Sequence, residues 1–290
     1  MLYFILVFLG FYVWHAMGIC IGYHRLLSHR SLACNKAVEY FFVLGGFLAF
    51  EGSPIWWATM HRAHHRHSDT PLDPHSPLNG WFNAHIGWTM LKTYPAHIQP
   101  ATQAKDLLKD PIYCFLEQDG DWTRAHTLNF ALGFAYRGLL WACFGWQVAL
   151  ASLLAGFAVL QIPLMLNLFC HMPKLGYRTF ATTDVSVNVW WVAILALGEG
   201  WHNNHHAAPG SAQTGLKWWE FDPSWLTLKL LKKVGLIQRL NQMDEERLHA
   251  KLRREAEKAI RDALPPSEEL AMVAAETSTA SGGKSVSRVA

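Results

Sequence analysis

The sequence predicts an all-α integral membrane protein that carries a histidine-rich helical cap. Of its 290 residues, 51% are hydrophobic and only 16% are charged, whereas soluble globular domains carry about a quarter charged residues. The chain also has 16 histidines but only five cysteines, without a C-x-x-C pair. This pattern excludes a cysteine zinc site and disfavours a disulfide framework. The net charge of +3 is too small for a basic surface that binds nucleic acid.

The first apolar stretch, residues 1–23, contains no Lys, Arg, Asp or Glu and ends before His24. At a rise of about 1.5 Å per residue, a helix of this length crosses a hydrocarbon core of about 30 Å. The stretch lacks the basic start and the A-x-A cleavage site of a signal peptide. We therefore expect a membrane span.

A second long apolar tract, Thr127 to Cys170, has Arg137 as its only formal charge and is interrupted near Gly145. Its length fits two spans, about 127–146 and 147–170, that cross the membrane and return as a hairpin. Pro163 is expected to kink or open the second span, because proline lacks the backbone N–H that an interior helical position donates.

Two shorter apolar segments, about 38–57 and 185–198, are predicted to lie in the membrane interface. The first contains Glu51 and Pro54, and the second is too short to span. If neither crosses, every histidine cluster that follows an apolar segment lies on one face. The positive-inside tendency makes that face cytoplasmic, because it carries Arg25, Arg30, Lys36, Arg62, Arg66, Lys92, Lys174 and Arg178.

The composition changes after the membrane domain, which we expect to cover residues 1–241. Residues 244–262 are a highly charged, helix-like stretch, and Pro265 and Pro266 lead into a tail rich in Ala, Ser, Thr and Gly. Residues 242–290 are therefore predicted to form a charged helix and a disordered tail, whose apolar surface is too small to offset the entropy of ordering.

Three histidine clusters stand out: His24 with His29, H-R-A-H-H over residues 61–65, and H-N-N-H-H over residues 202–206. In the second and third, spacings of three and four place all three imidazoles on one helical face, as a metal site requires. In the first, a separation of five turns the side chains about 140° apart on an ideal helix. Either that helix ends between them or the two histidines bind different metals. Eight imidazoles are too many for one ion, so two metals are predicted, and imidazole alone does not identify them.

These clusters resemble those of the membrane-bound delta-9 fatty acid desaturase family, of the stearoyl-CoA desaturase type in its bacterial form. The resemblance covers about residues 10–241. It implies four spans where three are visible here, so the family's first span is expected to be missing or misassigned. The matching segments are G-Y-H-R-L-L-S-H-R-S from Gly22, H-R-A-H-H from His61, D-P-H-S-P from Asp73, G-W-F-N-A-H-I-G-W from Gly80, G-E-G-W-H-N-N-H-H from Gly198 and W-W-E-F-D from Trp218.

The resemblance implies a di-iron site and an O2-dependent reaction that places a cis double bond, by analogy at delta-9, in a saturated acyl chain. It also adds the segment N-L-F-C-H over residues 167–171 to the ligand set. No flavin, haem or iron–sulfur motif occurs, so a separate ferredoxin-like or cytochrome-like electron donor is expected. The implied ligands are His24, His29, His61, His64, His65, His171, His202, His205, His206 and, through a water, Asn167.

Further residues are expected to support this site. A histidine ligand is usually oriented by an acceptor on its second ring nitrogen, which makes Glu199, Asp69 and Asp73 candidates. The two aspartates could equally cap a proline-rich turn. Trp57 resembles a residue that lines the family's acyl tunnel, and Trp201 is expected to shape the site.

Other functions stay open at this stage. The same scaffold could serve a di-iron fatty acyl or sterol hydroxylase, whereas a histidine-rich metal transporter would place its ligands inside the spans. Animal acyl-CoA desaturases have charged residues where this chain has Thr59 and Met60, so acyl-CoA, phospholipid and glycolipid are all candidate substrates. The expected location is the bacterial inner membrane.

Overall fold

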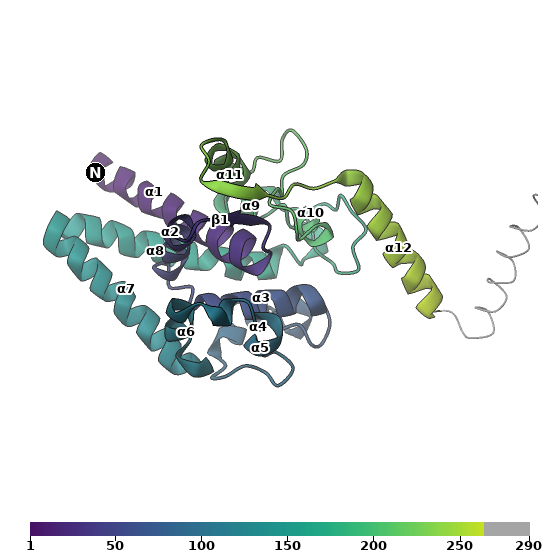
Figure 1. Cartoon of the computed structure of the whole chain (residues 1–290), viewed down its shortest axis with the longest axis horizontal. Coiled ribbons are helices and arrows are strands. Elements are labelled where there is room, and N and C mark those ends of the chain that lie inside the picture. Colours follow the sequence, from purple (N-terminus) through teal and green to yellow (C-terminus); the bar gives the residue numbers. More distant parts are fainter. Residues whose placement is uncertain (264–290) are drawn as a thin grey trace, which may run out of the picture. The chain divides into compact units, whose positions relative to one another are not determined.

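Figure 1 shows the computed structural model, which describes residues 1–263. The chain divides at Met243 into two compact units. The first unit is mostly helical and contains one small sheet, in which β1 (Leu32–Cys34) pairs antiparallel with β2 (Ile237–Leu240). The described part of the second unit is α12 (Glu245–Ala263), so the charged stretch is helical, as predicted. The tail predicted to be disordered lies outside the described residues.

Two helical stretches in the described chain are long and apolar enough to cross a membrane, Leu2–Ser28 and Trp146–Phe169. The first begins as α1 (Leu2–Met17) and continues as a π-helix, η1 (Gly18–Ser28). The second is α8, which packs against both α1 and α7 (Trp122–Phe144). Gly145, with φ of 87°, separates α7 from α8 at the predicted interruption. Pro163 lies inside α8, which continues on both sides of it.

The apolar segment 38–57 forms two helices with a break between them. They are α2 (Lys36–Phe47) and α3 (Pro54–His67). The side chain of Ser53 accepts a hydrogen bond from the backbone N–H of Trp56, which caps α3, and Gly52 before it has a positive φ of 75°. These local signals start a new helix where the apolar pattern alone would continue the old one.

The remaining helices are short and join the longer ones. The segment 185–198 contains only a six-residue helix, α9 (Trp190–Leu195). The others are α4 (Trp81–His85), α5 (Pro100–Gln103), α6 (Pro111–Glu117), α10 (His202–Ala207) and α11 (Pro223–Lys233).

Glycines allow η1 to approach α2 very closely. A Cβ atom built at Gly18 would lie 2.2 Å from the backbone nitrogen of Gly46, and one at Gly22 would lie 2.9 Å from the carbonyl carbon of Phe42. Small residues at a helix contact let two backbones pack directly on each other, which is common between membrane helices. This contact holds the part of η1 that carries His24.

Buried arginines connect distant segments. Arg137, 4% exposed, donates to the carbonyl oxygens of Leu48 (2.6 Å) and Gly133 (3.0 Å), so the single charge of the second apolar tract joins α7 to the end of α2. Arg25, 1% exposed, donates to Glu199 (2.9 Å) and Asp222 (3.0 Å). The first histidine segment is thereby tied to two segments near the C-terminal end of the first unit.

The glycine contact can be tested by substitution. Gly18→Ala is expected to destabilise the protein by about 3 kcal/mol, the upper end for overpacking, because the new methyl group meets backbone atoms that cannot move aside. Gly10→Ala on the same helix meets nothing within 4 Å and is the matched control. Thermal unfolding in detergent measures the difference, and equal melting temperatures for both variants would contradict the proposed packing.

Candidate metal centre

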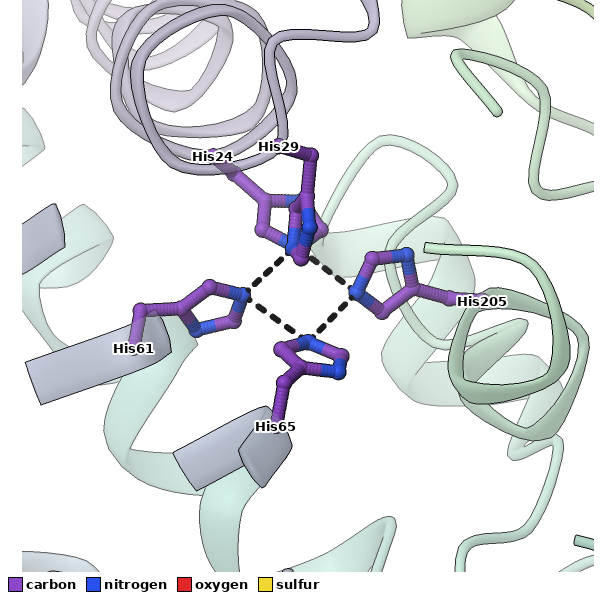
Figure 2. Close-up of side chains that lie close together, drawn as sticks. All are labelled: His24, His29, His61, His65 and His205. Atoms are coloured by element: carbon purple, nitrogen blue, oxygen red, sulfur yellow. Dashed lines mark hydrogen bonds between the residues drawn. The ribbon is translucent and has the colours of Figure 1, made fainter. Parts of the chain in front are cut away.

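Nine histidines converge into two groups. The ligand nitrogens within each group lie within 4.8 Å of one another. Figure 2 shows the larger group, with its five rings pointing toward a common centre. The five-histidine group is His24, His29, His61, His65 and His205, and the four-histidine group is His64, His171, His202 and His206.

The π-helix explains how His24 and His29 reach the same group. Its hydrogen bonds run from residue i+5 to residue i, and the backbone N–H of His29 donates to the carbonyl of His24 at 3.0 Å. This wide turn brings residues five apart to one side, with ring centroids 4.7 Å apart. The helix ends at Ser28, with His29 as its C-cap. Of the two alternatives that the sequence left open, the structure agrees with the first: the helix ends between the two histidines, and both belong to one group.

Each of the other two clusters contributes to both groups. On α3, His61 and His65 belong to the five-histidine group and His64 to the other. On α10, His202 and His206 belong to the four-histidine group and His205 to the first. The expectation that each cluster closes around one metal is wrong, because a spacing of four keeps two rings together while the third faces the neighbouring group. His171, which follows the end of α8, completes the four-histidine group.

Carboxylates contact the second ring nitrogen of four of these histidines. Nδ1 of His24 lies 2.7 Å from Glu199, that of His64 lies 3.0 Å from Asp73, and that of His171 lies 2.9 Å from Asp69. These are the three carboxylates considered from the sequence. Asp73 also accepts from the backbone N–H groups of Asp69 and His75, so it caps the turn and contacts a histidine at once.

The fourth carboxylate, Asp184, is not among the candidates that the sequence indicated. It lies 2.9 Å from Nδ1 of His206 and also accepts from Ser186 and Thr182. Asp184 is 22 residues from its histidine and has no local motif around it. Its position in a polar segment before the third histidine cluster is the one feature of the sequence that could have indicated a role for Asp184.

The protonation pattern of the four-histidine group fits a cation. An Nδ1–H that donates to a carboxylate leaves a lone pair on Nε2. Nε2 atoms of His171 and His206 lie 3.1 and 3.0 Å from Nε2 of His202, which can supply a proton to only one of them. Nε2 of His64 is buried and has no hydrogen-bond partner within the described structure. Facing lone pairs repel one another unless a positive charge lies between them, so these residues fit a metal ion.

The ionisation states of the three histidines on α10 and of Asp184 also suit metal binding. Burial lowers the pKa of His202 and His205 well below the ordinary value, and it lowers that of His206 to about 4 despite the attraction of Asp184. Burial opposes ionisation of Asp184, but the hydrogen bond and charge of His206 hold its pKa below the ordinary range. At neutral pH these three imidazoles are therefore neutral ligands and Asp184 is a carboxylate, the forms that bind a cation.

Two apolar cavities meet beside the histidines at Trp57 and Pro163, which line both of them. The indole of Trp57 stacks on His61 with ring centroids 4.9 Å apart, and its N–H donates to Glu51 at 3.1 Å. The smaller cavity, about 30 Å³, is lined by Ile19, His24, Trp57, His61, Ile162, Pro163, Leu166, Asn167, Glu199 and His202. The larger, about 190 Å³, is lined by Phe50, Glu51, Trp56, Trp57, Ile86, Trp88, Thr89, His126, Phe130, Leu160, Pro163 and Leu164.

Two sequence-predicted residues lie outside the histidine groups. Asn167 lines the smaller cavity next to them. Trp201 is buried and donates its indole N–H to the carbonyl of Phe221 at 2.9 Å, and among the described residues it lines neither cavity.

Comparison with known proteins identifies the family. The model of the fatty acid desaturase family matches residues 1–231. The chain belongs to the fatty acid desaturase family. As a member of this family the protein is a membrane-associated oxidoreductase of fatty acid biosynthesis, and its two histidine groups can hold metal ions.

Curated relatives of this desaturase differ in the acyl carrier that their names state. It is 40% identical over 237 residues to an sn-1 stearoyl-lipid 9-desaturase of Anabaena variabilis, which covers 81% of this chain and 83% of the relative. It is 39% identical over 241 residues to an sn-2 palmitoyl-lipid 9-desaturase of Nostoc, covering 81% and 80%. An acyl-CoA C20 Delta5-desaturase of Anemone leveillei is 39% identical over 220 residues, covering 76% and 67%.

The contact between Asp184 and His206 predicts a loss of metal on substitution. Asp184→Ala removes the acceptor that fixes the ring of His206, and the expected loss in iron affinity is about 10- to 100-fold. Asp184→Asn keeps an acceptor oxygen and is expected to lose less. Iron per protein after dialysis against graded chelator concentrations measures the effect. Iron retention by Asp184→Ala equal to that of the unsubstituted protein would contradict this role.

Proposed function

We propose that the protein is an O2-dependent acyl-lipid desaturase that places a cis double bond at delta-9 of a saturated acyl chain. The observation that carries this proposal is the pair of histidine groups beside an apolar cavity in a chain of the desaturase family. Two iron ions would be held by the nine grouped histidines, with Asn167 acting through a water. Iron bound there supplies the oxidising power that an unactivated methylene C–H bond requires.

A membrane lipid is the acyl carrier that fits this chain best. Thr59 and Met60, which stand where animal acyl-CoA enzymes have charged residues, are 0% and 1% exposed and offer nothing to a soluble head group. The cyanobacterial relatives are named as stearoyl-lipid and palmitoyl-lipid 9-desaturases. The proposed substrate is therefore a glycerolipid that carries a saturated chain of 16 or 18 carbons, as those relatives' names state.

The two cavities form the proposed path of the acyl chain. Apolar side chains of α8, including Ile162 and Leu164, line the path and exclude water from the reacting carbons. Trp57 stands where the cavities meet, and its hydrogen bond to Glu51 fixes the ring at that point. The chain would pass this ring to bring its ninth and tenth carbons to the histidines.

The proposed membrane arrangement has three spans, α1 with η1, α7 and α8, with α2, α3 and α9 near the interface. The basic residues next to the histidine clusters favour a cytoplasmic face for the site. The proposed location is a bacterial inner membrane, with residues 242–290 as a separate C-terminal part. A separate ferredoxin-like or cytochrome-like protein with its reductase would supply two electrons for each double bond.

Expression in an unsaturated-fatty-acid auxotroph tests the activity. The chain is expected to restore growth and to add monounsaturated acyl groups with the double bond between carbons 9 and 10, located by gas chromatography and mass spectrometry. His64→Ala, which removes a buried histidine of the four-histidine group, is the inactive control. Hydroxylated acyl chains in place of alkenes would favour the hydroxylase, and no rescue by an iron-loaded chain would contradict the proposal.

Substitution of Trp57 tests the acyl path. Trp57→Ala is expected to spread the double-bond position and to lower product formation by tenfold or more, because a displacement of about 1 Å at the reacting atoms can cost about 100-fold. Trp57→Phe keeps a ring over His61 but loses the hydrogen bond to Glu51. Its product yield and its spread of double-bond positions should lie between those of the unsubstituted protein and Trp57→Ala. Iron content of both variants is measured alongside. An unchanged product pattern with Trp57→Ala would exclude Trp57 from the path.

A further inference from the structure

The two histidine groups differ in the acidic residues around them. In the four-histidine group, Asp69, Asp73 and Asp184 each contact an imidazole. Among the described residues, none of these three carboxylates pairs with a lysine or arginine. In the five-histidine group, only His24 contacts a carboxylate of the described part of the chain, and that carboxylate, Glu199, is also bound by Arg25 at 2.9 Å.

The arginines show the opposite distribution. Four of the five residues in the five-histidine group are followed directly by an arginine, and none in the four-histidine group is. Arg62 is 12% exposed and donates to the carbonyls of Leu27 (2.6 Å) and Ser28 (2.8 Å), immediately before His29. The four arginines are Arg25, Arg30, Arg62 and Arg66. Arg25 pairs with Glu199 and Asp222, and Arg62 and Arg30 lie 2.6 and 3.8 Å from Asp106. Among the described residues, the carboxylates near the five-histidine group are therefore balanced by arginines, whereas those that contact the four-histidine group are not.

The charges around a metal ion influence which oxidation state it prefers. Nearby carboxylates stabilise the more oxidised ion and lower its reduction potential, whereas nearby cations have the opposite effect. Burial strengthens the contrast, because these charges act through a medium of low polarity. Of two iron ions held by these residues, the one in the five-histidine group would accept an electron more readily.

The five-histidine group is also the more accessible of the two to a protein that delivers electrons from solution. His29, His61 and His65 are partly exposed, whereas all four members of the other group are buried. The side chain of Arg30 is 66% exposed, and Arg66 is exposed as well. Arg239, also exposed, donates to the backbone carbonyl of Arg30 at 2.9 Å. Exposed arginines therefore accompany the more accessible histidines. We call Arg30, Arg66 and Arg239 the basic rim.

From this juxtaposition we infer that electrons reach the protein through the five-histidine group, delivered by an acidic one-electron carrier that docks on the rim of Arg30, Arg66 and Arg239. This inference rests on the proposed function. Each encounter oxidises the carrier by one electron and reduces the site by one. Two encounters supply two electrons which, with O2 and two protons, convert one CH2–CH2 unit into CH=CH and two waters.

Reduction kinetics test the docking surface. Iron-loaded protein is mixed with reduced [2Fe–2S] ferredoxin, an acidic carrier, and oxidation of the ferredoxin is followed by absorbance. Arg30→Glu with Arg66→Glu is expected to slow this reaction at least tenfold at low salt, because steering by complementary charge raises association rates by about 10- to 1,000-fold. The difference should shrink as added salt screens the charges. Reduction by an uncharged photoreduced deazaflavin should stay unchanged.

The matched control carries the same change in net charge elsewhere. Lys92→Glu with Arg124→Glu alters two exposed residues that follow no histidine of either group. If both double variants slow the ferredoxin reaction equally, net charge alone is responsible and the docking surface is wrong. If reduction of the Arg30→Glu, Arg66→Glu variant by deazaflavin is slower as well, Arg30 and Arg66 act on the histidine site itself and not on binding of the carrier. Normal reduction without any alkene product would contradict the proposed function alone.

Mössbauer spectra of one-electron-reduced protein test which group accepts the electron. The sample should contain one ferrous and one ferric component. Asp184→Asn, which alters the partner of His206, is expected to change the ferric parameters and leave the ferrous ones unchanged. A change confined to the ferrous component would place the electron in the four-histidine group and overturn the inference.

Discussion

Gathering nine imidazoles with their ligand nitrogens turned toward one another is the constraint on which the structure depends. Without cations between them, these lone pairs repel and lose the hydrogen bonds that water would supply. Part of this unfavourable free energy is offset by carboxylates that contact four of the rings. The other rings are held in place by packing between helices. Such a centre is more stable with metal than without it, since a ligand that binds only the folded state adds its binding energy to the stability.

Close backbone packing supplies the precision that this arrangement needs. Gly18 and Gly22 let η1 lie directly on α2, and the π-turns that follow bring His24 and His29 to one side. Arg25, between them in sequence, points instead to Glu199 and Asp222. Because Glu199 also contacts His24, one buried ion network joins the first histidine segment to the residues just before the third.

Much of this site could be predicted from the sequence, for reasons that also explain the failures. Helical spacing marked the histidines of α3 and α10, and resemblance added His171, because local patterns preserve such information. The assumption of 3.6 residues per turn hid the π-helix, left the assignment of His24 and His29 open and grouped the three histidines of each later cluster around one metal. Asp184 was missed because its contact with His206 depends on how a loop folds back. The break before α3 required reading Gly52 and Ser53 as local signals against a continuous apolar pattern.

The distribution of charge gives the two groups different chemical surroundings although their ligands are alike. Imidazole is the ligand type in both, so any difference between the two positions must come from neighbouring groups, number of ligands and access. The three aspartates lie on the buried side, and the exposed arginines follow histidines of the accessible side. Under the two proposals above, substrate carbons and electrons would approach by separate routes. The smaller apolar cavity is lined by His61 of one group and His202 of the other, whereas Arg30, Arg66 and Arg239 are exposed. An arrangement of this kind would let a reductant reach the centre without opening the proposed path of the acyl chain.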